Sequence, residues 1–179
     1  MSSVDLENLK KLDYPPLTQD LDEAKEHLDL YGLALIENAL SDEEVKEMDD
    51  RLNEQFLGEE KFKVGSKLRG DEGFGVESSE EQKVSRLVWN LINKGDCFLK
   101  LIDHPKILPL IQHIIGERVC LCSMGAHMNG SGNERMALHQ DQWPLVPHPM
   151  NFPFMANVMY LISDNSPENG GTRLIPGSH

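Results

Sequence analysis

Two amphipathic helices are the clearest feature of the polar and apolar pattern in the first third of the chain. Asp20 and Glu23 have the spacing of a capping box at the start of the first helix, and Gly32 marks its end. Ser41 and Glu44 form a second capping box. Apolar residues then recur on one face of each predicted helix: Leu21, Ala24, Leu28 and Tyr31 in the first, and Val45, Met48, Leu52 and Phe56 in the second.

The middle of the chain predicts a long loop followed by two more helices. Residues 58–82 are rich in glycine, lysine and glutamate, and loops of that length are typical of lids or binding segments. Apolar residues at helical spacing predict helices over residues 84–92 and 107–115. The second of these follows Pro105 and ends at Gly116.

After Gly116 the pattern becomes extended, as it also does at residues 33–36 between the first two helices. The extended segments are Arg118–Met128, Met136–Gln140, Met155–Ile162 and Arg173–Pro176, with a turn signal at Gly130–Asn133. Helices followed by antiparallel strands indicate the α+β class. We expect a single domain over residues 1–179, mainly helical over residues 1–116.

Composition narrows the class of partner and compartment. The 179 residues carry 17 Lys and Arg against 30 Asp and Glu, a net charge of −13, which argues against nucleic acid and anionic membranes as partners. The acidic N-terminus lacks the features of a signal peptide. Cys97, Cys120 and Cys122 form no CxxC pair, and we expect the last two to be buried apolar residues. These features together predict a reduced, cytoplasmic protein.

The strongest candidate for chemistry is His139-Gln-Asp141. On a strand, residues two apart point to the same face, so the imidazole and the carboxylate converge. Nitrogen and oxygen donors suit a divalent metal, and such a pair commonly supplies two corners of the two-His, one-carboxylate triad that binds non-haem Fe(II). Gln142 and Trp143 follow directly and are candidate substrate-lining residues, although Trp143 fits a core or rim position equally well.

Several segments of the sequence resemble the phytanoyl-CoA dioxygenase-like family of Fe(II)/2-oxoglutarate oxygenases. The resemblance rests on the segments Leu138–Gln142, Ala156–Tyr160 and Glu168–His179, the last reading Glu-Asn-Gly-Gly-Thr-Arg-Leu-Ile-Pro-Gly-Ser-His. Tyr31–Ser41 and Val88–Leu108 are also similar to the corresponding parts of that family.

The resemblance implies a double-stranded β-helix, or jelly roll, with N-terminal helices packed on it, of which residues 117–179 would form the first portion. It also implies Fe(II) held by His139, Asp141 and a second histidine, with 2-oxoglutarate and O2 as cosubstrates and a small-molecule substrate. Thr172 matches a family threonine near the cosubstrate. Asn157, the one polar residue in an apolar run, either faces this pocket or satisfies a backbone group. His127 has the same parity as the two ligands and is a further cofactor-binding candidate.

The sequence departs from the family at its C-terminus. In the family, the distal histidine and an arginine lie several strands beyond the Pro-Gly-Ser-His motif, whereas here that motif ends the chain at His179. The resemblance places His179 in the turn after Pro176-Gly177 rather than at the family's distal-ligand position, and His148 lies in a predicted loop. Both are therefore weaker candidates for the third ligand than a histidine at the family's distal position. Only 63 residues follow Gly116, and a closed eight-stranded barrel needs roughly 70 or more. We therefore expect an incomplete barrel whose open edges favour self-association.

Three interpretations remain open at this stage. The chain is a truncated and inactive part of an Fe(II)/2-oxoglutarate dioxygenase, a catalytically dead relative that binds a ligand or partner, or a cupin-like metalloprotein that is not an oxygenase. The presence of the Asp141 carboxylate argues against halogenation, which requires that ligand position to be free for chloride.

Overall fold

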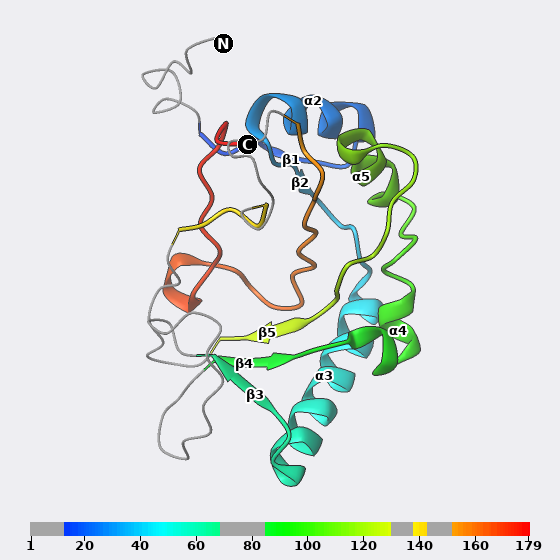
Figure 1. The fold of residues 1–179 in the computed structure, drawn as a ribbon, viewed down its shortest axis with the longest axis vertical. Helices are drawn as coiled ribbons and strands as arrows, with labels where there is room; N and C mark the ends of the chain where they lie inside the picture. The colour runs from blue at the N-terminus through cyan, green and yellow to red at the C-terminus, as the bar shows by residue number, and fades with distance from the viewer. Residues whose placement is uncertain (1–12, 69–84, 130–137, 143–151) are drawn as a thin grey trace.

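The computed structural model describes residues 13–68, 85–129, 138–142 and 152–179, and Figure 1 shows how they are arranged. The helices are α2 (Leu21–Tyr31), α3 (Asp42–Phe62), α4 (Asp96–Leu99) and α5 (Leu108–Ile115), with 3-10 turns η1 (Leu91–Asn93) and η2 (Pro167–Asn169). The strands are β1 (Leu17–Thr18), β2 (Leu35–Ile36), β3 (Ser66–Leu68), β4 (Ser85–Val88) and β5 (Ala126–Met128). Within the described ranges, no helix is both long enough and apolar enough to cross a membrane.

The strands form two small sheets. β1 and β2 pair in parallel, and β3, β4 and β5 form an antiparallel sheet with β4 in the centre. The described strands do not close a barrel. A mixed helix and strand fold is therefore confirmed, whereas the jelly roll stays a prediction.

The capping signals place the first two long helices correctly. The Asp20 carboxylate accepts hydrogen bonds from the backbone N–H groups of Asp22 and Glu23 at 2.8 and 3.1 Å, and Gly32 ends the helix in the left-handed conformation at φ +71°. At Ser41 both bonds of the capping box are present, so α3 begins as predicted. It does not end as predicted, because the helix continues through Gly58 to Phe62, and the expected loop over residues 58–82 is wrong at its start.

The helix predicted over residues 84–92 is wrong, because β4 and η1 occupy this stretch. Leu87 and Val88 are adjacent in β4, and both are almost fully buried, at 1% and 0% exposure. A central strand that is covered on both faces has a continuous apolar run, and short runs of this kind do not distinguish a strand from a helix. By contrast, the helix after Pro105 is confirmed as α5, which ends before Gly116.

The predicted C-terminal strands are mostly absent from the described residues. Of Arg118–Met128 only the last three residues form a strand, and Cys120 and Cys122 are exposed rather than buried. Residues 155–162 and 173–176 form no strand, and Met159 is 58% exposed. None of the described strands pairs with these two stretches, and an apolar run without a pairing partner does not form a strand.

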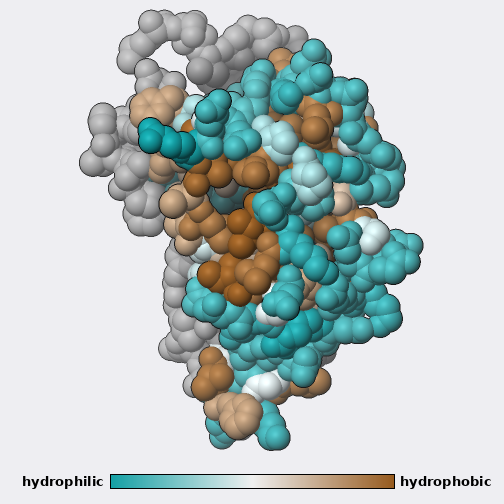
Figure 2. All heavy atoms as spheres, turned by 90° about the vertical axis from the view of Figure 1, so that its right-hand side faces the viewer, coloured by the Kyte–Doolittle hydropathy of each residue, from teal (hydrophilic) through white to brown (hydrophobic). Residues whose placement is uncertain are grey.

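The core lies between α3, α4 and the inner face of the antiparallel sheet. Its buried members are Met48, Phe56, Val88, Leu91, Cys97, Phe98 and Leu101. Two residues of the C-terminal segment, Tyr160 and Ile162, pack against this cluster, so the last part of the chain is joined to the helical part. The outer side of the helices is largely hydrophilic, with an apolar patch between the hydrophilic residues (Figure 2).

The two ends of the described chain meet (Figure 1). The Tyr14 hydroxyl donates to the Leu174 carbonyl at 2.9 Å, and the Leu174 N–H donates to the same hydroxyl at 3.0 Å. The Gly177 N–H donates to the carbonyl of Tyr31 at 2.7 Å, at the end of α2. The segment containing Thr172 is thereby fixed at its C-terminal side.

Candidate metal site

His139 and Asp141 converge as the sequence predicts, although not on a strand. The described residues 138–142 lie in an irregular segment that ends in a turn. The Nε2 atom of His139 lies 3.4 Å from Oδ1 of Asp141. Their side chains are 44% and 49% exposed, so both side chains are accessible to solvent.

The second oxygen of the Asp141 carboxylate has its own partner. The side-chain amide of Asn157 donates a hydrogen bond to Oδ2 of Asp141. Asn157 therefore lies beside the candidate metal ligands, and its polarity within an apolar run is explained by a side-chain contact rather than by a backbone group. Its direct role in cofactor binding stays a prediction.

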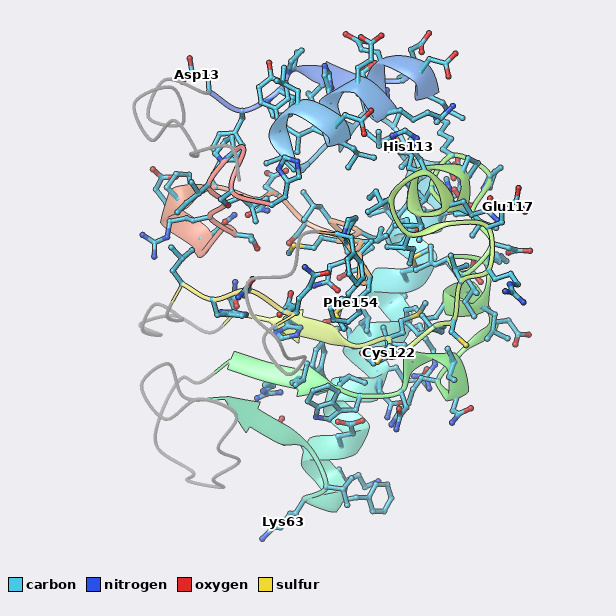
Figure 3. All side chains as sticks on the ribbon, turned by 45° about the horizontal axis from the view of Figure 1, so that its top comes forward. Asp13, Lys63, His113, Glu117, Cys122 and Phe154 are labelled. Atoms are coloured by element: carbon cyan, nitrogen blue, oxygen red, sulfur yellow. The ribbon has the colours of Figure 1, made fainter. Side chains whose placement is uncertain are left out.

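Gln142 connects the same segment to the chain that follows. Its Oε1 accepts a hydrogen bond from the backbone N–H of Phe154 at 2.9 Å. Phe154 is partly buried (Figure 3). The sequence does not predict this contact, because it shows only that the Gln142 amide follows the His139-Gln-Asp141 motif directly. The role of Gln142 in lining a substrate pocket stays a prediction, and Trp143 lies outside the described residues.

His127 lies on β5 directly opposite Leu87 of β4. Paired residues share a face of the sheet, so His127 lies on the face opposite to that of Val88 and the helical core. Partial desolvation lowers the pKa of the His127 imidazole from its ordinary value, which favours the neutral ring at neutral pH.

Asn129, which belongs to none of the motifs in the sequence, joins β5 to the turn before Thr172. Its side-chain amide donates to the Gly170 carbonyl at 3.0 Å. Because Asn129 is two residues after His127 and Gly170 is two residues before Thr172, this bond brings the two predicted cosubstrate residues into the same region. Gly170 has φ +84°, and a Cβ atom there would lie 3.0 Å from the Asn129 amide, so glycine suits this close approach.

The described residues supply two candidate metal ligands rather than three. No group of three or more His, Cys, Asp or Glu side chains with a metal-binding arrangement occurs among them. His179 instead lies against Gly32, where an added Cβ would meet the imidazole ring. His148 lies outside the described residues.

A match to a protein-family model decides to which family the chain belongs. The family model described as phytanoyl-CoA dioxygenase (PhyH) matches residues 28–179. The chain belongs to the phytanoyl-CoA dioxygenase family. This match covers both the helical part and the segments that carry His139 and Asp141, so the resemblance of the motifs is confirmed.

Two curated proteins are similar in sequence to this chain. Dioxygenase af480 of Aspergillus fumigatus is 27% identical over 163 residues, which is 91% of this chain and 50% of the relative. A probable alpha-ketoglutarate-dependent hypophosphite dioxygenase of Stutzerimonas stutzeri is 28% identical over 158 residues, 88% of this chain and 53% of the relative. The chain thus spans about half the length of these relatives. No solved structure matches.

Proposed function

We propose that this chain carries the metal-binding motif of an Fe(II)/2-oxoglutarate-dependent dioxygenase that hydroxylates a small organic substrate. The observation that carries the proposal is the convergence of His139 Nε2 and Asp141 Oδ1, 3.4 Å apart and half-exposed. Membership of the phytanoyl-CoA dioxygenase family supports it, as does the relative named as alpha-ketoglutarate-dependent.

The donor pair fits a divalent metal in type and in spacing. One imidazole nitrogen and one carboxylate oxygen are the donors that non-haem Fe(II) uses in a facial triad. His139 Nε2 and Asp141 Oδ1 lie 3.4 Å apart, so both atoms could bind the same ion after a small side-chain rotation.

The residues of the chain would hold the ion and keep part of its surface open. His139 would bind through Nε2 and Asp141 through Oδ1, because Oδ2 accepts the hydrogen bond of Asn157. When bound, iron supplies the oxidation chemistry in which 2-oxoglutarate, O2 and a substrate R–H give succinate, CO2 and R–OH. The carboxylate ligand blocks the position that a halide would need, so hydroxylation is favoured over halogenation.

His127, Asn157 and Thr172 are the proposed cosubstrate residues. The Asn129–Gly170 hydrogen bond supports the pairing of His127 with Thr172, since it joins the end of β5 to the turn before Thr172. A neutral His127 imidazole can donate a hydrogen bond to a carboxylate without contributing a full charge. Trp143 and Gln142 are the proposed substrate-lining residues.

The test is whether 2-oxoglutarate chelates a metal held by this motif. The 179-residue chain is loaded with Fe(II) without oxygen, and 2-oxoglutarate is added while the visible charge-transfer absorption is recorded. We expect a new band for the native chain and none for His139→Ala. Metal binding without a band would support a cupin-like metalloprotein instead, and the absence of metal binding would support a relative that binds other ligands or partners.

A separate expectation concerns turnover. The described residues offer two candidate ligands, and two protein ligands hold an ion less firmly than three. We therefore expect the 179-residue chain alone to form no succinate in air with Fe(II) and ascorbate. Succinate formation that disappears in His139→Ala would overturn this expectation while supporting the proposed chemistry.

A further inference from the structure

Both residues at the end of the His-x-Asp segment are hydrogen-bonded to one later stretch of chain. The Asn157 amide donates to Oδ2 of Asp141, and the Phe154 N–H donates to the side chain of Gln142 at 2.9 Å. The segment that carries the candidate ligands is therefore held from one side by residues 154–157. Neither contact is a consequence of sequence proximity, since Asn157 is 16 residues from Asp141 and Phe154 is 12 residues from Gln142.

The stretch that holds Asp141 is itself attached to the helical core. The Tyr160 hydroxyl donates to the carbonyl of Leu101 at 3.1 Å, and its ring centroid lies 5.9 Å from that of His104. Ile162 packs against the buried core cluster. Because Asn157 is only three residues from Tyr160, its amide projects from a segment whose position is set by the core.

On this basis we propose that Asn157 is a positioning residue that fixes the orientation of the Asp141 carboxylate for metal binding. The inference rests on the proposed function, because it takes Asp141 as a metal ligand. A half-exposed carboxylate that lacks a second partner can rotate about its terminal torsion and offer either oxygen or both. The amide donor on Oδ2 keeps Oδ1 directed at His139 Nε2, so that the carboxylate binds through one oxygen.

The chemistry of the side chain at position 157 matters as much as its location. An amide donates a hydrogen bond to a carboxylate without bringing a charge that would compete with a cation. Partners that hydrogen-bond to metal ligands orient those ligands, and losing one typically costs about ten- to hundredfold in metal affinity. Leucine has a similar size and no donor, so Asn157→Leu removes the hydrogen bond with little change in volume.

The experiment compares Co(II) dissociation constants, and the Co(II) absorption spectrum, for the native chain and four variants. The variants are Asn157→Leu, Asn157→Ala, Asp141→Ala and the double variant Asp141→Ala/Asn157→Leu. Val158→Ala is the matched control, because Val158 is adjacent and is 41% exposed. Thermal unfolding of each metal-free chain shows whether it is folded, and Asn157→Ala provides a second test if the leucine variant fails to fold.

We expect Asn157→Leu to raise the Co(II) dissociation constant about ten- to hundredfold, and to change the absorption spectrum, while Val158→Ala changes neither. In the Asp141→Ala background, Asn157→Leu should have no further effect, because the carboxylate on which it acts is gone. Native-like affinity in both Asn157 variants would overturn the inference, as would an equal loss in the Asp141→Ala background. If Asp141→Ala itself leaves affinity unchanged, the proposed function fails rather than the role of Asn157.

Discussion

Tyr160 joins the C-terminal segment to the helical core, and replacing it with phenylalanine isolates that connection. The substitution removes the hydroxyl that donates to the Leu101 carbonyl at 3.1 Å and leaves the ring in place. A hydrogen bond of this kind contributes about 1 kcal/mol to the free energy of unfolding. At pH 7 we therefore expect Tyr160→Phe to be less stable than the native chain by about 1 kcal/mol.

The same side chain predicts how that difference changes with pH. Burial raises the pKa of Tyr160 from 10 to about 12, since ionisation would place a charge in a poorly solvated position. A phenol whose pKa is raised in the folded state stabilises the fold fully below the unfolded pKa near 10, and this contribution is lost as the pH rises towards 12. A pKa difference of about 2 between the folded and unfolded states corresponds to about 2.7 kcal/mol of folding free energy. Because the ring is partly exposed, we expect a smaller loss of stability, about 1–2 kcal/mol.

The assay is urea unfolding of both chains between pH 7 and pH 11.5, followed by far-UV circular dichroism. The free energies of unfolding should converge above pH 10, because only the native chain carries the ionising hydroxyl. Titration of lysines and of the other tyrosines is common to both chains and cancels in the difference. A constant difference across the whole pH range would refute the proposed burial of this hydroxyl.

Two further predictions concern the helix ends and a helix interior. Gly32→Ala should destabilise the fold by about 1–2 kcal/mol, because φ at Gly32 is +71° and the new Cβ would meet the His179 ring. Gly58→Ala lies inside α3, where the new Cβ would meet nothing within 4 Å, so this substitution should stabilise the fold by about 0.5–1 kcal/mol. Equal effects of the two substitutions in chemical denaturation would contradict this contrast. Ser41→Ala should cost about 1 kcal/mol by removing the cap of α3. Hydrogen bonds from the backbone N–H and the hydroxyl of Ser41 lower the pKa of Glu44. The contribution of this capping box to the free energy of unfolding should therefore be lost as the pH falls below about 4.5. In the same measurement, the free energy of unfolding of Ser41→Ala should depend less on pH in the acid range.

The sequence predicts helices well wherever a local signal specifies an end. The side chains of Asp20 and Ser41 and the conformation of Gly32 act within one turn of chain, so their effect does not depend on the tertiary fold. The position of a strand, by contrast, depends on the tertiary fold. Leu87 and Val88 in β4 are buried by two different surfaces, and that arrangement is set by β3, β5 and α3 rather than by the local pattern.

For the candidate site, the motif predicts the pair of ligands but not what holds them. The spacing of His139 and Asp141 is enough to bring their side chains together, although the segment is irregular rather than a strand. The contacts of Asn157 with Asp141 and of Asn129 with Gly170 join residues 16 and 41 positions apart. Contacts of this range depend on the path of the chain between them, which hydrophobic spacing does not encode.

The central claim is that His139 and Asp141 bind a divalent metal, and equilibrium dialysis of Fe(II) without oxygen tests it most directly. A second His–Asp pair provides the control, because His113 Nε2 lies 2.8 Å from Oδ1 of Asp29 on the surface of the helical part. We predict one Fe(II) bound per native chain and per His113→Ala chain, and loss of that binding in both His139→Ala and Asp141→Ala. Unchanged Fe(II) binding in the His139 and Asp141 variants would contradict the account.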